Sequence, residues 1–274
     1  MFKVAAIQMN SLNHKGENIK KAEDLISKAV SSGAKLILLP ENFSFMGDNE
    51  KDKLFVAETL NEGASINFLR CSAKEHKVWV AGGTIPLKAG DPNKVTNTLL
   101  LFNDQGEKVG CYDKIHLFDV TLSDNESYSE SNVIKEGNKP VTVKTPFGCL
   151  GLTICYDLRF PELYRKLTHM GAEIFLVPSA FTYATGNAHW EILLRARAIE
   201  NQAYVIAAAQ VGDHPGGRRT FGHSMIIDPW GQVLSEVDEE NDDMALAEID
   251  ITKVYEVRKK MPCLTQRRMK ITAI

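Results

Sequence analysis

The sequence predicts an α/β protein, specifically a four-layer αββα sandwich of two mixed sheets related by pseudo-two-fold internal symmetry. Three observations predict this class. Apolar, strand-like segments alternate along the 274 residues with segments of helical periodicity. Two sequences with turn chemistry, NDQG at 103–106 and DPWG at 228–231, each lie between apolar segments and predict hairpins. Finally, GAKLILLP at 33–40 is echoed by GAEIFLVP at 171–178.

Each strand is expected where aliphatic and β-branched residues dominate a short segment. In chain order the expected strands are 3–9, 35–39, 78–84, 97–103, 149–155, 173–177, 204–209, 223–228 and 244–249, with another around 108–113. Helices are expected where apolar residues recur every three to four positions, at 17–31, 60–76, 161–170 and 188–202. Because strands this apolar need cover on both faces, the helices should lie against the sheets.

The internal echo predicts how the layers are arranged. Each copy follows a helix and is followed by another helix, another strand and one of the two hairpins, and VAAIQMN at 4–10 similarly aligns with LGLTICYD at 150–157. We therefore expect two equivalent halves, roughly 1–120 and 145–250, each contributing one sheet. The simpler alternative is two α/β units that share a common sequence pattern. A single continuous sheet would exclude the two-sheet arrangement.

Residues 1–274 are expected to form one domain. The stretch 119–140 is a long polar connection, and loops of that length in a compact domain tend to be functional. The segment 250–274 is basic and is expected to be a C-terminal arm on the surface. Either solvent or a second subunit would cover that arm, and the sequence leaves this choice open.

Composition excludes several classes of protein. With 32 Lys and Arg against 35 Asp and Glu, the net charge of −3 is too even to indicate nucleic acid or an anionic membrane as a partner. No apolar run approaches the 18 residues of a membrane span, and the N-terminus lacks signal-peptide features. Five cysteines without framework spacing favour a reducing, cytoplasmic location, with a mitochondrial share left open. Without metal-ligand spacing, GxGxxG or a P-loop, we expect no metal and no organic cofactor.

Three residues with catalytic chemistry follow expected strands: Glu41, Lys114 and Cys155. Cys155 lies shortly before Pro161, an expected helix start, where a thiol ionises more easily and becomes a nucleophile. Glu41 could take the thiol proton and return it to a leaving amine if burial raises its pKa. Lys114 suits the stabilisation of an oxyanion, together with the backbone N–H of Tyr156.

Simpler explanations exist for each residue taken alone. Glu41 could be a carboxylate at a helix N-terminus, and Lys114 could be a surface lysine. A lone cysteine is usually a small buried hydrophobe. That is the expectation for the other four cysteines, Cys71, Cys111, Cys149 and Cys263.

Three blocks around these residues resemble, in order, the signature blocks of the nitrilase (carbon-nitrogen hydrolase) superfamily. They are PEN at 40–42, KIHLFD at 114–119 and GLTICYDLRFPE at 151–162. The resemblance extends from residue 3 to about 250. It implies the αββα sandwich and a triad of Glu41, Lys114 and Cys155. It also implies a second glutamate that positions the lysine and the substrate amide, expected at Glu130, with Glu126 as the alternative.

Four further segments resemble the Nit branch of this superfamily. They are PSAF at 178–181, GNAHWE at 186–191, RARAIEN at 195–201 and GHSM at 222–225. The branch implies a cysteine-dependent amidase that repairs a metabolite, hydrolysing deaminated glutathione to 2-oxoglutarate and Cys-Gly through a thioester acyl-enzyme. The substrate would be a small anionic amide, and the assembly a homodimer or larger homo-oligomer. An ω-amidase acting on 2-oxoglutaramate, or a hydrolase of carbamoyl amides or nitriles, stays open.

A substrate with two carboxylates calls for arginines. Arg159 is expected to bind the acyl-side carboxylate, because its forked donors match that geometry. A structural salt bridge of Arg159 with Asp157 or Glu162 is the alternative. The other expected substrate contacts are Tyr156, Thr182 and Phe181, and the leaving-group carboxylate is expected to meet His214, Arg218 or Arg219.

Two readings from other functional classes are weaker. An inactive enzyme fold that serves as a binding protein has no need of Glu41, Lys114 and Cys155 together. A redox sensor built on Cys155 would need a resolving cysteine nearby, and Cys149 lies six residues back on the same strand pattern.

Overall fold

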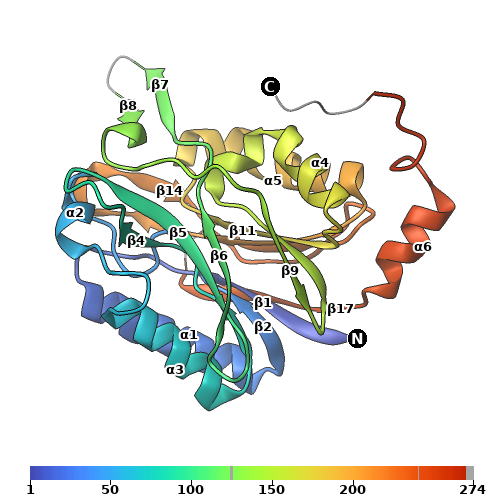
Figure 1. Cartoon of the computed structure of the whole chain (residues 1–274), viewed down its shortest axis with the longest axis horizontal. Coiled ribbons are helices and arrows are strands. Elements are labelled where there is room, and N and C mark those ends of the chain that lie inside the picture. The colour runs from blue at the N-terminus through green and yellow to red at the C-terminus, as the bar shows by residue number, and fades with distance from the viewer. Residues whose placement is uncertain (124–125, 240, 270–274) are drawn as a thin grey trace.

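The computed structural model describes residues 1–123, 126–239 and 241–269 and shows two sheets stacked between helices (Figure 1). The seven-stranded first sheet comprises β1 (Phe2–Gln8), β2 (Ala34–Leu38), β3 (Trp79–Ala81), β4 (Ile85–Lys88), β5 (Val95–Phe102), β6 (Lys108–Asp113) and β17 (Asp243–Ile249). The six-stranded second sheet comprises β9 (Val141–Thr145), β10 (Gly148–Leu152), β11 (Ile174–Ser179), β12 (Tyr204–Ala209), β15 (Met225–Ile227) and β16 (Val233–Glu236).

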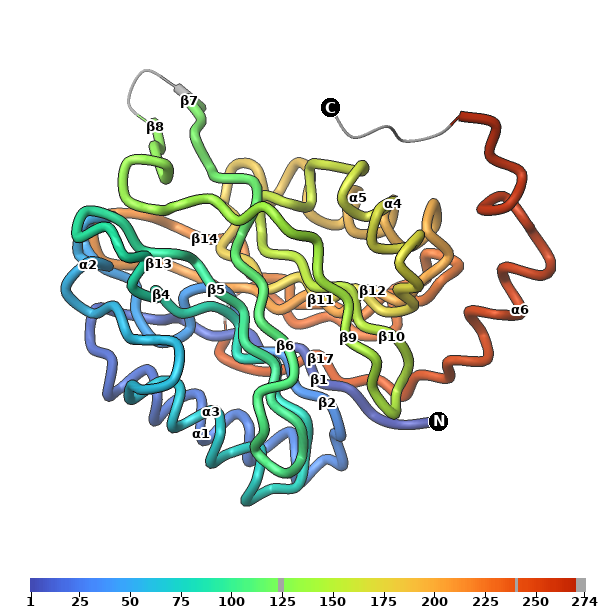
Figure 2. Tube along the Cα trace, in the orientation of Figure 1, coloured from blue at the N-terminus to red at the C-terminus, as the bar shows by residue number. Residues whose placement is uncertain are grey.

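The helices lie outside the two sheets. They are α1 (Lys15–Ser31), α2 (Asp52–Val56), α3 (Ala64–His76), α4 (Pro161–His169), α5 (Tyr183–Asn201) and α6 (Thr252–Lys260). Helices α1 and α3 cover the first sheet, and α4 and α5 cover the second (Figures 1 and 2). Two small hairpins complete the fold, β7 (Asp119–Ser123) with β8 (Glu126–Ser129) and β13 (Val211–Asp213) with β14 (Arg219–Phe221).

The two sheets repeat the same strand pattern, which confirms the predicted class of two mixed sheets. In each, three parallel strands form the centre: β1, β2 and β3 in one, and β10, β11 and β12 in the other. In each sheet an antiparallel strand pairs with the first of the three parallel strands: β17 with β1 in the first sheet, and β9 with β10 in the second. The predicted hairpins follow as β5–β6 and β15–β16.

One part of the predicted division into halves is wrong. The strand expected at 244–249 belongs to the second half in sequence, but β17 pairs along its full length with β1 in the first sheet. β1 pairs with β2 on one side, and β17 covers its other edge, where backbone donors and acceptors would otherwise be left unpaired. The sheet of the first half is therefore completed by the end of the second.

Alternation along the strands divides the core into layers. Val4 and Leu36 belong to a cluster that also contains Leu150, Leu176 and other residues of the second sheet. Their neighbours Ala5 and Ile37 belong instead to a cluster with residues of α1 and α3. Because successive side chains of a strand point to opposite faces, one apolar strand can fill both an inter-sheet core and a helix-facing core.

Several local features differ from the sequence prediction. The expected strand 149–155 ends at Leu152, three residues before Cys155, and α5 begins five residues earlier than expected. The polar stretch 119–140 contains the β7–β8 hairpin, with Asp124 and Asn125 outside the described residues.

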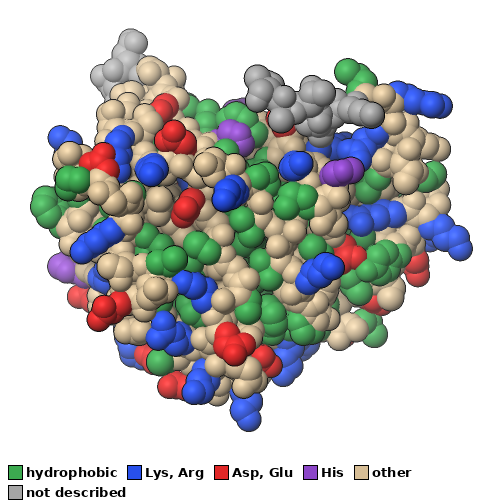
Figure 3. Space-filling model, viewed as in Figure 1, with side chains coloured by type: hydrophobic (Ala, Val, Ile, Leu, Met, Phe, Trp, Pro, Cys, Tyr) green, Lys and Arg blue, Asp and Glu red, His purple; other side chains and the backbone are tan. Residues whose placement is uncertain are grey.

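The basic segment from 250 onwards contains an unpredicted helix, α6, whose Val254 and Val257 are buried. Residues 270–274 of that segment lie outside the described residues. On the face shown in Figure 3, basic and acidic side chains are interspersed, as the even charge balance suggests. None of the helices in the described ranges is both long and apolar enough to cross a membrane.

Candidate active site

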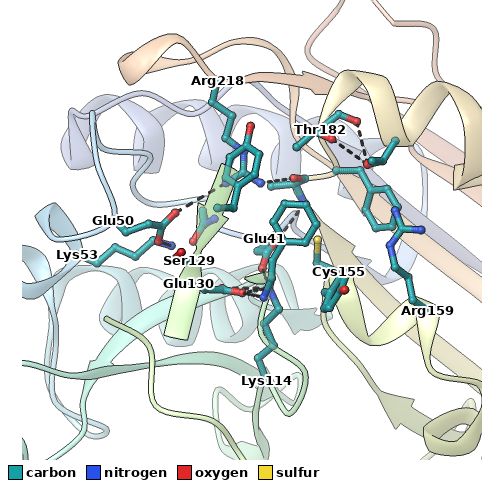
Figure 4. Close-up of a pocket in the computed structure, with 17 residues that line it drawn as sticks. Glu41, Glu50, Lys53, Lys114, Ser129, Glu130, Cys155, Arg159, Thr182 and Arg218 are labelled. Atoms are coloured by element: carbon teal, nitrogen blue, oxygen red, sulfur yellow. Dashed lines mark hydrogen bonds and ion pairs between the residues drawn. The ribbon is translucent and has the colours of Figure 1, made fainter. Parts of the chain in front are cut away.

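The three strand ends chosen from the sequence meet at one pocket. Glu41 comes shortly after β2, Lys114 directly after β6 and Cys155 shortly after β10, and all three line the pocket with Glu130 (Figure 4). All four side chains are buried. Two sheets thus contribute to one site, because their equivalent edges face each other across the inter-sheet core.

Lys114 is held between two carboxylates. Its Nζ donates to Oε1 of Glu41 at 2.9 Å and to Oε2 of Glu130 at 2.8 Å. Burial lowers the pKa of the Lys114 ammonium, but the Glu130 and Glu41 carboxylates more than offset this and raise the pKa well above its ordinary value. Lys114 is therefore a permanent buried cation, and the alternative of a surface lysine is excluded.

Glu41 is fixed by donors from both sheets. Asn97 Nδ2 donates to its Oε1 at 2.9 Å, and the backbone N–H of Ala180 donates to its Oε2 at 2.9 Å. Its own carbonyl oxygen accepts from Gln210 Nε2 at 2.9 Å. The carboxylate is thus held in one orientation within the pocket, and the alternative of a helix N-terminal carboxylate does not apply.

Gly83 sets the path of the chain into Glu41. It has a φ of +50°, and a Cβ added to it would lie 2.0 Å from the carbonyl oxygen of Pro40. Only glycine combines this left-handed conformation with so close an approach of two backbone segments. The strand end that carries Glu41 is therefore packed directly against the end of β3.

Glu130 contacts the lysine, and the alternative Glu126 does not. The Glu130 carboxylate accepts from the backbone N–H of Phe118 at 2.7 Å in addition to Lys114, whereas Glu126 accepts from the hydroxyl of Tyr128. Burial raises the pKa of Glu130, but Lys114 outweighs burial and brings the pKa down to about 2. Glu130 is therefore an anion at neutral pH.

Cys155 begins a short 3₁₀ turn, Cys155–Arg159, with a φ of +47°. Helix α4 begins at Pro161, as predicted. The expectation that this helix start makes the thiol easy to ionise is wrong. Burial raises the pKa of the Cys155 thiol well above its ordinary value, and the Glu41 carboxylate raises it further, against an opposing effect of Lys114. The thiol is therefore protonated at neutral pH and needs a base to become a nucleophile.

Asp157 holds the Cys155–Arg159 turn in place through its side chain. Its carboxylate is fully buried and accepts from the backbone N–H of Ile154 at 2.9 Å and from the hydroxyl of Tyr112 at 2.7 Å. It also accepts from the backbone N–H of His116 and contacts Nδ1 of the same ring. These contacts tie the chain on either side of Lys114 to the turn that carries Cys155.

The pocket above these residues has an empty volume of about 470 Å³, including its open mouth. All four predicted substrate contacts line it: Tyr156, Arg159, Phe181 and Thr182. Arg159 makes no salt bridge with Asp157 or Glu162 within the described residues, so that alternative fails. Its guanidinium lies 5.2 Å from the ring centroid of Phe181, and its Nη1 is 3.2 Å from Nδ1 of His189.

The other predicted contacts divide into those that face the pocket and those that do not. Thr182 reaches it, although its hydroxyl also bonds with that of Thr185 at 2.8 Å. Of the three candidates for the leaving-group carboxylate, only Arg218 lines the pocket. His214 is buried between the carbonyl of Ser11 and the hydroxyl of Thr220, and Arg219 is exposed, so Arg218 is the one of the three alternatives that remains.

Sequence reasoning missed several residues of the site. Glu50 and Lys53 lie at one end of the pocket (Figure 4), and Asn97, which does not itself line the pocket, bridges Glu41 and Glu130. A polar side chain inside an otherwise apolar strand, as at Asn97 in β5, is a signal that could have been used. Glu50 and Lys53 lie in a polar segment that carries no comparable signal.

The remaining cysteines differ from expectation. Cys71 and Cys111 are exposed, and Cys149 and Cys263 are half-buried, so the prediction that all four are buried hydrophobes is wrong. All five cysteines are free thiols. Cys155 is the buried one among them, which separates it from the others by environment as well as by sequence.

Comparison with known proteins decides the family. The family model for carbon-nitrogen hydrolases matches residues 3–259. The chain belongs to this family. It is therefore a hydrolase that acts on carbon–nitrogen bonds, as the three sequence blocks predicted.

Three relatives illustrate the similarity. The chain is 46% identical to deaminated glutathione amidase of Synechocystis over 269 residues, covering 97% of this chain and 98% of the relative. Its structure resembles that of Saccharomyces cerevisiae Nit3, a member of branch 10 of the nitrilase superfamily, with a TM-score of 0.87, 33% identity and coverage of 98% and 97%. It also resembles the Caenorhabditis elegans NitFhit protein, with a TM-score of 0.89 and 39% identity. There the similarity covers 97% of this carbon-nitrogen hydrolase but spans only 65% of the longer NitFhit chain.

These relatives confirm the resemblance to the Nit branch, and the neighbouring structures confirm the fold class.

Proposed function

We propose that this hydrolase is an amidase that cleaves deaminated glutathione into 2-oxoglutarate and Cys-Gly, repairing a damaged metabolite. Relatives named for this activity are 46% and 44% identical to the chain over nearly its whole length. One structural observation carries the mechanism. Lys114 is a buried cation held by two carboxylates beside a buried, protonated thiol. This arrangement suits acyl transfer through a cysteine.

In the first half of the reaction, Glu41 takes the thiol proton as the Cys155 sulfur attacks the amide carbonyl. The oxyanion that forms is stabilised by the Lys114 ammonium and the backbone N–H of Tyr156. The carbon–nitrogen bond then breaks while protonated Glu41 gives its proton to the nitrogen. Cys-Gly leaves, and an α-ketoglutaryl thioester remains on Cys155.

In the second half, water attacks the thioester carbonyl and Glu41 accepts the water proton. The second tetrahedral intermediate is held by the same donors and collapses by breaking the carbon–sulfur bond. The proton on Glu41 returns to the sulfur, and 2-oxoglutarate leaves. Glu130 keeps Lys114 aligned throughout, since both of its oxygens lie within 3.1 Å of the lysine Nζ.

The acyl-side carboxylate of the substrate is assigned to Arg159, with Phe181, Tyr156 and Thr182 forming the wall around it. The guanidinium lies 5.9 Å from the ring centroid of Tyr156 and 5.2 Å from that of Phe181, and Arg159 lines the pocket. Cation–π contacts of this kind hold a guanidinium in place without using its hydrogen-bond donors.

The decisive experiment measures kcat/KM for deaminated glutathione and for 2-oxoglutaramate with the same enzyme, with Cys155→Ala as the control. A strong preference for the peptide that is abolished in the variant is the expected result. A preference for 2-oxoglutaramate would keep the chemistry and move the protein to the ω-amidases. Activity on neither would overturn the substrate, and carbamoyl amides and nitriles would be assayed next. Mass spectrometry of a quenched reaction should detect the thioester on the peptide that contains Cys155.

Assembly and location complete the proposal. We place the enzyme in the cytoplasm, with a mitochondrial share left open, and propose a homodimer or larger assembly of single-domain chains with 250–274 as the C-terminal arm. The five free thiols suit a reducing compartment. Light scattering of the purified protein measures the assembly, and fractionation of cells measures the location.

A further inference from the structure

Three charged side chains at one end of the pocket have no part in the chemistry described above. Lys53 Nζ donates to Glu50 at 2.6 Å, and Nη1 of Arg218 lies 3.9 Å from the other oxygen of Glu50. All three line the same pocket as Cys155. The group contains two cations and one carboxylate, so it carries one positive charge that its own members do not neutralise.

The buried end of Arg218 is incompletely paired. Nη2 donates to the carbonyl of Ala180 at 2.5 Å, and the guanidinium lies 5.4 Å from the ring centroid of Tyr128. Its Nε is buried and has no hydrogen-bond partner among the described residues. Burial lowers the pKa of Arg218, but Glu50 and Glu41 more than offset this, so the group stays charged. A buried charged donor without a partner is costly, and the Nη1 donor at 3.9 Å from Glu50 is beyond hydrogen-bond distance of that carboxylate.

The position of this group relative to Cys155 indicates which part of a substrate it would meet. Figure 4 shows Arg159 on one side of Cys155 and Glu50 with Lys53 on the other. Arg218 interacts electrostatically with Glu41, and Lys53 with Glu130. The proton donor for a departing amine must lie next to that amine. The leaving group therefore extends past the two glutamates towards Arg218.

We propose that Arg218 and Lys53, held together by Glu50, form a subsite for a carboxylate on the leaving group of the amide. The subsite rests on the proposed function, in which the leaving group is a dipeptide that ends in a carboxylate. Arg159 and this subsite then bind the two ends of a dianionic substrate on opposite sides of the thiol. Ammonia, the leaving group of a simple amide, has no carboxylate for this subsite to bind. The subsite therefore determines specificity for the leaving group.

The test compares two substrates that differ only at this carboxylate: deaminated glutathione and its C-terminal carboxamide. The wild-type enzyme should prefer the free acid in kcat/KM by about 10- to 100-fold, the range expected for a charge-assisted hydrogen bond. Arg218→Gln should remove most of that preference by lowering kcat/KM for the acid far more than for the carboxamide. Lys53→Met should likewise lower kcat/KM for the acid more than for the carboxamide. Arg219→Gln is the matched control, because Arg219 is exposed and should leave the preference unchanged.

Equal losses on both substrates in the Arg218 and Lys53 variants would overturn the subsite, since a merely structural role lowers both alike. Absence of any wild-type preference for the acid would overturn it too. If Arg218→Gln fails to fold, as judged by its melting temperature, Lys53→Met decides the question alone. Failure of the proposed function is seen separately, because wild-type enzyme would then cleave neither peptide before any substitution is made.

Discussion

Nδ1 of His116 lies 2.7 Å from a carboxylate oxygen of Asp157, and this contact joins the segment after Lys114 to the turn that carries Cys155. The ring of His116 also stacks on the ring of Phe160, the residue that precedes α4, with 3.7 Å between the ring centroids. Two of the sequence blocks that identify the family are therefore one packed unit. The separation between the lysine and the thiol depends on a buried carboxylate that touches neither of them.

Asp157→Asn should lower kcat while leaving KM nearly unchanged, because Asp157 is not among the residues that line the pocket. The amide keeps one acceptor oxygen but, in either orientation, turns its NH₂ group towards a backbone N–H donor, that of Ile154 or that of His116. We expect a loss of roughly 2 to 3 kcal/mol in the free energy of unfolding, as for a broken buried network. Urea denaturation and steady-state kinetics measure both effects. An unchanged kcat would show that the network does not position the thiol. Asp119→Asn, the same substitution at an exposed aspartate, is the control and should change kcat and stability far less.

Lys114→Met should reduce kcat by at least about 10²- to 10³-fold, since it removes an oxyanion donor and leaves two buried carboxylates facing each other. Single-turnover measurements should show that both formation and hydrolysis of the thioester slow down. Lys108→Met, at the exposed start of β6, the strand that Lys114 follows, should behave like the wild type. If the two variants have similar rates, Lys114 has no role in the chemistry.

His214 should make the protein less stable as the pH falls from about 6.5 to 4. Burial, more than the nearby Arg218, lowers the pKa of this histidine from 6.5 to about 4. The unfolded chain then binds more protons than the folded chain in this range, so stability is present above pH 6.5 and is lost on acidification. The loss should reach about 3 kcal/mol. Denaturation curves measured across this pH range give the free energy of unfolding at each pH. Its dependence on pH should become weaker in His214→Gln but not in His169→Gln, an exposed control. A slope that persists in His214→Gln would assign the effect to other groups.

Gly83→Ala should destabilise the protein by more than about 2 kcal/mol and lower kcat, because the new methyl group would displace the backbone before Glu41. Gly90→Ala is the matched control: Gly90 also has a positive φ, but a Cβ there has no neighbour within 4 Å. That control should cost only about 1 kcal/mol and leave kcat unchanged. Equal effects of the two substitutions would mean that conformation, and not the contact with Pro40, is what matters.

Most of the strands and helices could be predicted because their signals are local. Period-two and period-3.6 patterns, the turns at 103–106 and 228–231, and Pro161 at the start of α4 all act within a few residues. The repeat between 33–40 and 171–178 even predicted two sheets. In the same way, the three blocks around Glu41, Lys114 and Cys155 identified the family, because each block is a short local motif that resembles a family signature.

Long-range contacts decided the rest. No signal near β17 in the sequence predicts that this strand pairs with the edge of β1. No signal in the segment from 250 onwards predicts that α6 buries Val254. The pKa of Cys155 depends on burial among groups distant in sequence, which reversed the expectation from the nearby helix start.

The side chains that shape the pocket followed the same division. The residue types needed for amide chemistry can be read along the chain, because each strand end carries its own signature. That Glu130 and not Glu126 meets Lys114, and that Arg218 lines the pocket while His214 and Arg219 do not, could not be predicted. The direction of a side chain in a loop is set by what packs against it, and here the partners include residues distant in sequence, such as Glu50 for Arg218 and Ser11 for His214.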